Sequence, residues 1–216
     1  MNYLAHLYLA ERSTDSLIGN LLGDFVKGRL RGQYNAAIMQ GIALHRKIDT
    51  FTDAHAITRS SRKLISPGRR RFAGIIVDLG YDHFLARHWH RYTDVELSSF
   101  VREVYRTLEH RSSILPDNLQ HLLPRMTSED WLNSYKDLSG IASALDRISM
   151  RFKRTNSLMG SVEEIERHYE CLQGQFLEFF PQVIRFAKQN HFTDSAGTQN
   201  ARRLSENSDR SKGKTD

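Results

Sequence analysis

The sequence predicts an all-α fold in a single domain, and three observations lead to this expectation. Apolar residues recur with the 3.6-residue period of a helix along most of the chain up to residue 188. Alternation of apolar and polar residues, which is typical of strands, is scarce. Only four prolines and 13 glycines interrupt a chain of 216 residues, of which 39% are hydrophobic, and this is enough for one sizeable core.

Helices are expected wherever the apolar pattern restarts, and several of these starts carry a residue that favours a first turn. Thr14, Asp94, Ser128 and Ser161 each stand just before a periodic run, where a side-chain oxygen can accept a backbone N–H. The acids that follow Ser161 also lie in a first turn, where the helix dipole favours negative charge. The expected helices cover 2–11, 14–28, 35–52, 55–65, 70–91, 94–112, 116–124, 128–136, 138–153 and 161–188.

The last part of the chain is expected to be disordered. The helical pattern stops near residue 188, and the segment "DSAGTQNARRLSENSDRSKGKTD" has almost no large apolar residues to bury. We therefore expect one all-helical domain over residues 1–190 and a disordered polar tail over 191–216. No internal repeat divides the domain further.

Composition excludes several classes of protein. No run of 18 apolar residues is present, so no membrane span is expected. The first residues lack the cationic start and cleavage site of a secretory signal, which favours a cytoplasmic protein. The single cysteine, Cys171, excludes an internal disulfide framework and fits a reducing compartment. Its flanking residues indicate an amphipathic helix, so we expect a structural thiol.

The stretch "LHRKIDTFTDAH" places His45, Asp49 and Asp53 at a strict four-residue spacing. On an α-helix each such step drifts by only about 40°, so the three side chains form one ribbon. Such a ribbon either binds a ligand or forms a solvated polar edge of the helix.

Other polar residues interrupt helices that otherwise read as core. Within "FAGIIVDLGYDHFLARHWH", Asp78 and Asp82 stand four residues apart among large apolar residues. Burying an unpaired carboxylate costs several kcal/mol, and either a divalent cation or a buried arginine would offset this cost. Helical bundles build internal metal sites by aiming such groups at one point, and the set favours a metal centre. Its members are His6, Asp24, His45, Asp49, Asp78 and Asp82.

The expected ligands narrow both the ion and the reaction. Carboxylates with a minority of imidazoles favour Mn²⁺ or Mg²⁺, and Fe²⁺ also fits, whereas no cysteine cluster indicates structural zinc. The chain has neither a phosphate-binding G-x-x-x-x-G-K-[ST] loop nor a dinucleotide-binding turn, and it lacks the G-x-S-x-G elbow of a serine hydrolase. Metal-assisted hydrolysis of a phosphoester is therefore the leading chemistry.

Four segments resemble, in order, the motifs of the acyl carrier protein phosphodiesterase family, also called holo-acyl-carrier-protein hydrolases. They are "NYLAHLYLA", "GNLLGDFVKG", "GIALHRKIDTFTDAH" and "AGIIVDLGYDHFLARHW", and the resemblance covers the chain to about residue 188. It implies a divergent all-helical relative of the HD-domain metal phosphohydrolases. It also implies a cytoplasmic enzyme of lipid metabolism that uses Mn²⁺. The implied reaction hydrolyses the phosphodiester between 4'-phosphopantetheine and a serine of holo-acyl carrier protein, giving the apo form and free 4'-phosphopantetheine.

The adjacent His-Asp pair that names the HD superfamily is absent here, so ligand roles cannot be copied by position. We expect Asp24, His45, Asp78 and Asp82 as the first metal ligands, followed by Asp49 and His6. A carboxylate, Asp49 or Asp53, is expected to accept the proton of the attacking water. His83 either supports the ligands or belongs to the core. Asp53 and His55 either position the phosphate or cap the helix end, with capping favoured.

A basic stretch supplies an expected docking surface. The formal net charge is +6, and "RSSRKLISPGRRR" holds six basic residues without an acid: Arg59, Arg62, Lys63, Arg69, Arg70 and Arg71. The resemblance implies that they attract acyl carrier protein, a small acidic helical protein.

Two alternatives to this function remain. One is an HD-type nucleotide phosphohydrolase, which would use the same kind of metal centre. The other is a non-enzymatic helical module that binds nucleic acid, but the basic stretch has few aromatics to stack on bases. We expect neither a nucleic acid nor a membrane as a partner, and the sequence sets no oligomeric state.

Overall fold

Helices make up the regular structure of residues 1–28 and 32–211, which are the residues that the computed structural model describes, with side chains as far as residue 191. The expected all-α fold is confirmed, since no strand occurs in this part of the chain. The α-helices are α1 (Tyr3–Leu9), α2 (Thr14–Leu22), α3 (Ala36–Ala54), α4 (Ala56–Leu64), α5 (Ala73–Arg87), α6 (Leu97–His110), α7 (Asp117–Ser128), α8 (Trp131–Ser134), α9 (Leu138–Ser149), α10 (Val162–Arg167) and α11 (Tyr169–Ser211). Three 3₁₀ helices join them: η1 (Pro67–Phe72), η2 (Trp89–Arg91) and η3 (Ser112–Ile114).

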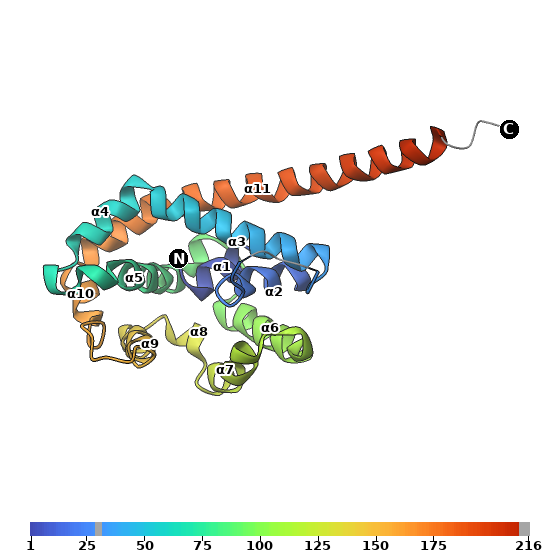
Figure 1. Cartoon of the computed structure of the whole chain (residues 1–216). Helices are drawn as coiled ribbons and strands as arrows, with labels where there is room; N and C mark the ends of the chain where they lie inside the picture. Colours follow the sequence, from blue (N-terminus) through green and yellow to red (C-terminus); the bar gives the residue numbers. More distant parts are fainter. Residues whose placement is uncertain (29–31, 212–216) are drawn as a thin grey trace.

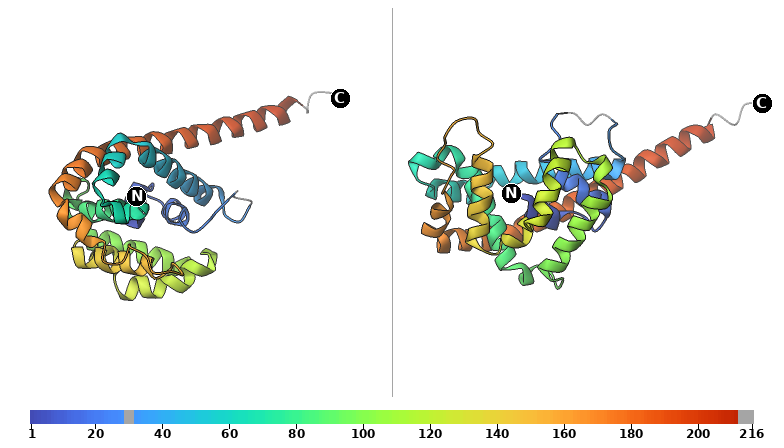
Figure 2. Two further views of the ribbon diagram at one scale, coloured as in Figure 1. Left: turned by 60° about the vertical axis from the view of Figure 1, so that its left-hand side comes forward. Right: turned by 90° about the horizontal axis from the view of Figure 1, so that it is seen from below.

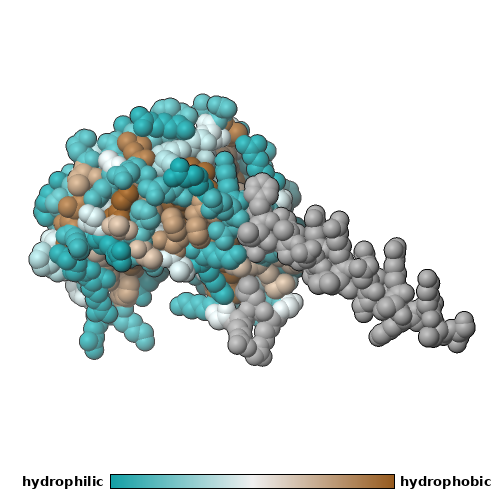
Figure 3. Space-filling view, turned by 90° about the horizontal axis from the view of Figure 1, so that it is seen from above, coloured by the Kyte–Doolittle hydropathy of each residue, from teal (hydrophilic) through white to brown (hydrophobic). Residues whose placement is uncertain are grey.

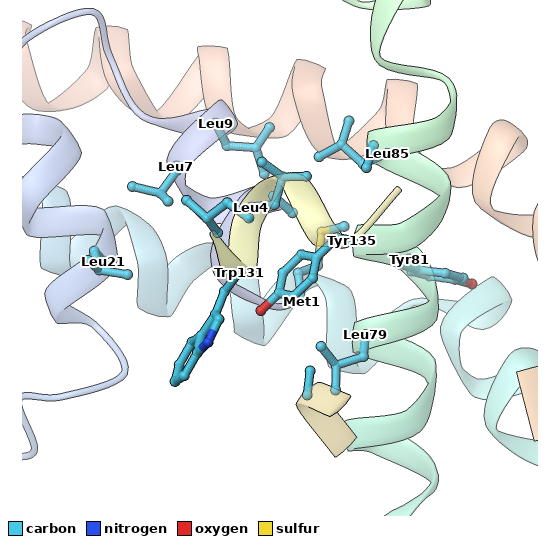
Figure 4. Close-up of a cluster of buried hydrophobic side chains, with 14 of the residues drawn as sticks. Met1, Leu4, Leu7, Leu9, Leu21, Leu79, Tyr81, Leu85, Trp131 and Tyr135 are labelled. Atoms are coloured by element: carbon cyan, nitrogen blue, oxygen red, sulfur yellow. The ribbon is translucent and has the colours of Figure 1, made fainter. Parts of the chain in front are cut away.

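Helix α5 lies at the centre of the domain and contacts α1, α4, α9, α10 and α11 (Figure 1). It buries residues on nearly all of its faces, as expected for a helix that is apolar all round. Figure 4 shows Leu79 and Leu85 of this helix beside Met1, Leu4 and Tyr135. On its other side it meets aromatic residues of α11. The expectation of a core helix in this segment is confirmed. Because α5 is surrounded, residues along its whole length lie beside neighbouring helices.

Helices α2 and α3 cross at very short range because glycines face each other. A Cβ on Gly19 would lie 2.8 Å from the Cα of Gly41 and nearer still to the carbonyl oxygen of Ile38. A Cβ on Gly41 would lie 2.8 Å from the carbonyl oxygen of Ser16. Real Cβ atoms do not approach other atoms so closely, so the crossing requires both glycines. It fixes the position of α3 relative to α2, and thereby the position of His45.

Several helix ends differ from the expected ones. The first cap of α2 is Ser13 rather than Thr14, since the Ser13 hydroxyl accepts the N–H of Ser16 at 3.1 Å. The same helix ends at Leu22 and not near residue 28; Gly23 is its C-cap, and a turn follows. The helix expected over 128–136 is reduced to the single turn of α8, and the one expected over 161–188 is divided into α10 and α11.

The backbone of α11 continues to Ser211, beyond the end near residue 188 that the sequence indicated. Figure 1 shows this extension leaving the body of the domain. The side chains of 192–211 and the whole of 212–216 lie outside the described part of the chain, so the disordered tail over 191–216 stays a prediction. Cys171, near the start of α11, is exposed.

The surface of the domain is mainly hydrophilic on the face that Figure 3 presents, with smaller apolar areas. Among the described residues, no helix combines the length and the apolar character that a membrane crossing requires.

Replacing Gly19 with alanine should destabilise the protein, because the new methyl group overlaps the backbone of α3. We expect a loss of about 1–3 kcal/mol in the free energy of unfolding, which urea denaturation would measure. Gly174→Ala is the matched control, since a Cβ there meets open space on a helix and should be neutral or stabilising. Equal stability of the two variants would contradict the close crossing.

Candidate metal centre

Helices α1 and α3 bring two buried histidines to one carboxylate. His6 comes from α1, and His45 and Asp49 stand one turn apart on α3. Nε2 of His6 lies 3.1 Å from Oδ1 of Asp49, and Nε2 of His45 lies 3.1 Å from Oδ2 of the same residue. The side chains of His6 and His45 are 1% and 2% exposed, whereas that of Asp49 is 39% exposed. The three residues form the one group among the described residues whose atoms are placed to hold a metal ion together.

The orientation of the His45 ring is fixed by a backbone carbonyl. Nδ1 of His45 donates to the carbonyl oxygen of Asn20 at 2.7 Å, because a carbonyl oxygen can only accept. The unprotonated Nε2 of a neutral ring then faces Asp49 and Asp24, whose oxygens lie at 3.1 and 3.7 Å. A lone pair that faces two carboxylates is unfavourable unless a proton or a cation lies among them. A histidine that ligates a metal usually donates its other N–H in this way.

The two imidazole rings stack on each other, with centroids 3.7 Å apart and planes at 21°. Gly23 provides the space for this arrangement, because a Cβ at this position would overlap the His45 ring. Gly23 stands directly before Asp24, so the residue that leaves room for the imidazole also begins the turn that carries a carboxylate. The absence of a side chain at Gly23 is therefore part of the design of the site.

The remaining acids surround the same point. Asp78 on α5 lies 3.4 Å from the Met1 ammonium, which is also 3.7 Å from Asp49. Burial raises the pKa of Asp24 and of Asp78, although His45 opposes the shift of the first and the Met1 ammonium that of the second. Burial lowers the pKa of the Met1 amine, but Asp78 and Asp49 outweigh it and raise the pKa above its ordinary value. The carboxylates thus share a site in which positive charge is strongly favoured.

His6 and Asp49 are in direct contact, but their pKa values are shifted by different dominant causes. Burial lowers the pKa of His6 to about 3, although the hydrogen bond to Asp49 opposes this change. Burial also acts to raise the pKa of Asp49, but its close contacts with His45 and His6 outweigh it and hold the pKa well below the ordinary range of an aspartate. His6 is therefore neutral and Asp49 ionised at neutral pH. These are the protonation states that metal ligands need.

The donor set fits a divalent cation. Ligand atoms bound about 2.1 Å from an ion at right angles are separated by about 3 Å, and the two His–Asp49 separations are 3.1 Å. Asp24 lies slightly farther out and is 38% exposed, so it can complete the set from the solvent side. Nδ1 of His6 is buried without a hydrogen-bond partner among the described residues, so this ring, unlike that of His45, is not oriented by a second hydrogen bond.

Asp82 has a different position from the one expected. Its side chain is fully buried, and its two oxygens accept the backbone N–H groups of Leu4 at 2.8 Å and Ala5 at 3.2 Å. Burial raises the pKa of Asp82 to about 7, against the hydrogen bonds that favour its charged form. It binds the first turn of α1, the helix that carries His6. The structure therefore assigns it to holding α1, outside the group that can hold a metal.

The other expected catalytic residues are occupied elsewhere. His83 lies between the carbonyl oxygen of Tyr135 at 2.9 Å and the hydroxyl of Tyr169 at 3.0 Å, so its place is in the core. His55 accepts the N–H of Ile57 at 3.2 Å and caps α4, in line with the favoured reading. Asp53 is exposed and pairs with Arg62. Among the expected catalytic acids, only Asp49 belongs to the group, and there it takes the place of a ligand.

The basic stretch is divided by its contacts. Arg62 pairs with Asp53, and Arg69 pairs with Glu163 and lies 3.5 Å from Glu164. Two other members, Arg59 and Lys63, are exposed on α4. The remaining two, Arg70 and Arg71, are exposed on η1. The charge of the stretch is therefore partly neutralised by neighbouring acids.

Three contributors were not foreseen from the sequence: the Met1 ammonium, the Asn20 carbonyl and Gly23. Neither an amino group nor a main-chain oxygen leaves a pattern in a sequence. Gly23 did leave a signal, because a glycine directly before an acid within an apolar run indicates a close approach.

Comparison with known proteins agrees with this geometry. A sequence model of the family described as "Acyl carrier protein phosphodiesterase" matches residues 1–183. The chain belongs to this family. Proteins named acyl carrier protein phosphodiesterase from Serratia proteamaculans and Klebsiella pneumoniae are each 39% identical to it, over 189 and 192 residues, with 87% of this chain and 98% of each relative covered. The one from Photorhabdus laumondii is 36% identical over 193 residues, covering 89% of this chain and 98% of its own.

No solved structure matches the chain. The relation to HD-domain phosphohydrolases therefore stays a prediction, whereas membership of the acyl carrier protein phosphodiesterase family is confirmed.

Replacing Gly23 with alanine should impair metal binding without abolishing folding, because the added methyl group displaces the His45 ring. We expect the affinity for Mn²⁺ to fall at least about tenfold in isothermal titration calorimetry. Gly174→Ala serves again as a control that meets open space. Unchanged Mn²⁺ affinity in Gly23→Ala would exclude His45 from the metal site.

The depressed pKa of His6 predicts acid sensitivity of the metal-free protein. Between pH 6.5 and about 3 the unfolded chain binds a proton at this residue and the folded protein does not. The free energy of unfolding should therefore fall as the pH decreases through this interval. In urea denaturation at several pH values, His6→Gln should show a shallower decline than the wild type. His90→Gln, which replaces an exposed histidine, should keep the wild-type slope, and equal slopes in all three proteins would contradict the buried neutral state of His6.

Proposed function

We propose that this protein hydrolyses the phosphodiester that joins 4'-phosphopantetheine to a serine of acyl carrier protein. The products are apo-acyl carrier protein and free 4'-phosphopantetheine. One observation carries the proposal, namely that His6, His45 and Asp49 converge at 3.1 Å in a chain of this family. The names of the relatives support the choice of substrate. A divalent cation at this point accounts for buried imidazoles that face carboxylates.

His6, His45 and Asp49 would hold the ion, and Asp24 would complete the ligand set. Mixed imidazole and carboxylate donors fit Mn²⁺, which we propose as the metal, and they also accommodate Mg²⁺ or Fe²⁺. When bound, the ion supplies positive charge to a phosphate oxygen and lowers the pKa of a water molecule.

The chain's own residues hold the ligands and receive the proton. The Asn20 carbonyl and the stacked His6 ring fix His45, and Asp82 fixes the start of α1. Asp78 is the group that we assign as proton acceptor, because it lies beside the cluster and outside the ligand set. Burial raises the pKa of its carboxyl group, the direction that strengthens a general base.

Arg62 is placed to meet the negative charge of the substrate. Asp53 pairs with its guanidinium, and the positive charge of Arg62 acts on Asp78, whose pKa it lowers. Arg62 therefore stands at the edge of the cluster, where it would face the phosphodiester. In this arrangement Asp53 positions Arg62 and does not act on the water.

Replacing Asp49 with asparagine should remove the charge that both histidines share and abolish the metal site. We expect turnover of holo-acyl carrier protein to fall at least about 100-fold, and a chelator should abolish the wild-type activity until Mn²⁺ is restored. A gel mobility shift from the holo to the apo form measures both effects. His90→Gln, at an exposed position, is the control and should retain full activity.

Three outcomes would change the proposal. Full activity in the presence of a chelator would exclude the metal. If Asp53→Asn lost as much activity as Asp49→Asn, Asp53 rather than Asp78 would be assigned as the proton acceptor. Hydrolysis of nucleotides without cleavage of holo-carrier protein would assign the centre to a nucleotide phosphohydrolase.

A further inference from the structure

The loop between α9 and α10 exposes large apolar side chains. Phe152 is 43% exposed, and its neighbours Met150 and Met159 are 63% and 55% exposed. Among the described residues, Val95 is the one other large hydrophobic residue exposed to this degree. Three such residues within one loop are unusual, because an isolated apolar side chain on a surface needs no explanation but a group of them often marks a binding surface.

The same loop is strongly basic. Arg151, Lys153 and Arg154 are all exposed, and the segment 150–160 contains no acid. None of these three side chains forms an ion pair in the described part of the chain, in contrast to Arg62 and Arg69. Unpaired cations that alternate with exposed apolar residues fit a partner that is both acidic and partly apolar.

Contacts between side chains join this loop to η1. Phe152 packs edge-on against Phe72 with ring centroids 5.5 Å apart, and the guanidinium of Arg71 lies 5.9 Å from the centre of the Phe72 ring. Arg69 donates to the carbonyl oxygen of Ser157 at 3.0 Å, and the Ser157 hydroxyl donates to the carbonyl oxygen of Gly68 at 2.8 Å. Arg69 therefore has a structural task, while Arg70 and Arg71 remain exposed beside the loop.

The loop also reaches the metal centre. The guanidinium of Arg151 lies against the hydroxyl of Tyr3, and Tyr3 in turn interacts with Asp24 and stacks on Phe25 at 6.0 Å. The right-hand view of Figure 2 shows that this loop and the segment that follows α2 project from the same side of the domain. The loop therefore lies on the side of the domain from which the segment that carries Asp24 projects.

We propose that the surface formed by Arg70, Arg71, Arg151, Phe152, Lys153 and Arg154, here called the basic-apolar surface, docks the acidic carrier protein. This inference rests on the proposed function and specifies where its substrate binds. It revises the expected docking site, which was confined to residues 59–71, by adding the α9–α10 loop and removing Arg62 and Arg69 from the protein–protein contact, while Arg62 keeps its proposed role beside the phosphodiester.

The chemistry of the substrate requires a docking surface that adjoins the metal. The phosphodiester is attached to a serine of the carrier protein, so the bond that breaks lies at the carrier's own surface. A carrier bound at a distant patch could not bring this bond to His45 and Asp49. Arg151 lies beside the Tyr3 hydroxyl, and Tyr3 stacks on Phe25, the residue next to Asp24, so the surface meets this requirement. Nucleic acid would also be attracted by the charge, but Phe152 is the one aromatic residue in the segment 150–160, whereas binders of single strands stack successive bases on several aromatics.

The test compares two charge reversals of equal size in the full-length protein. Lys153→Glu combined with Arg154→Glu alters the basic-apolar surface, whereas Arg102→Glu combined with Arg106→Glu alters exposed arginines on α6. Binding of apo-acyl carrier protein, which lacks the phosphodiester, is measured by isothermal titration calorimetry at low ionic strength. We expect Kd to rise about tenfold or more for the first variant and to change by less than about twofold for the second. The difference should shrink at high salt.

A second variant and a parallel assay separate the outcomes. Phe152→Ser should weaken carrier binding without the salt dependence, and melting temperatures establish that all variants are folded. If wild-type protein cleaves holo-carrier protein while the surface variants bind the carrier as tightly as wild type, the docking surface is wrong and the proposed function stands. If wild-type protein neither binds nor cleaves the carrier, both fail. If the Lys153/Arg154 variant loses affinity for a DNA duplex but not for the carrier, the surface serves nucleic acid and the proposal is overturned.

Discussion

The structure depends on two imidazole rings that are buried against carboxylates. A buried polar group costs free energy unless it has a partner, and His45 has the Asn20 carbonyl on one side and only anions on the other. The glycine crossing of α2 and α3 holds this geometry, because Gly19 and Gly41 allow the approach and Gly23 leaves space for the ring. In the proposed function a cation completes the arrangement, and the Met1 ammonium lies 3.4 Å from Asp78 and 3.7 Å from Asp49. The fold therefore assembles a site that is unfavourable in itself, and the proposed metal would stabilise it.

Two aspartates of similar sequence context have opposite tasks. Asp49 is partly exposed and binds both histidines, so its pKa is held low and its charge is available to an ion. Asp82 is fully buried at the start of α1, where it replaces the missing hydrogen bonds of the first helical turn. The first residue can act as a ligand because the second fixes the helix that carries His6. The proposed role of Asp49 thus depends on Asp82, which holds the helix that carries His6.

The sequence predicted the helical class, the central apolar helix and a convergence of acids and histidines, because periodicity and misplaced polar residues are local signals. It ranked Asp82 above Asp49 and His6, whereas the structure groups Asp49 and His6 with His45 and places Asp82 against the start of α1. Spacing shows which residues share a helix face, but it does not show whether that face meets another helix end or a cavity. The direction of Asp82 depends on where α1 begins relative to α5, which is a property of the tertiary fold. The same limit applies to Arg69, whose partners Glu163 and Glu164 lie more than ninety residues away.

The position of the site explains why the fold carries a basic loop far along the chain. A phosphodiester on a protein surface can be cut only if the enzyme brings its ions, its base and its docking residues to one shared edge. Helices α1, α2 and α3 supply the ligands, and α5 supplies Asp78, but none of these helices presents several exposed cations beside the cluster. The α9–α10 loop does so, because Phe152 is fastened to Phe72 and Arg151 contacts Tyr3. Recognition of the carrier and cleavage of its prosthetic group are thereby assigned to separate elements that meet at Tyr3 and Asp24.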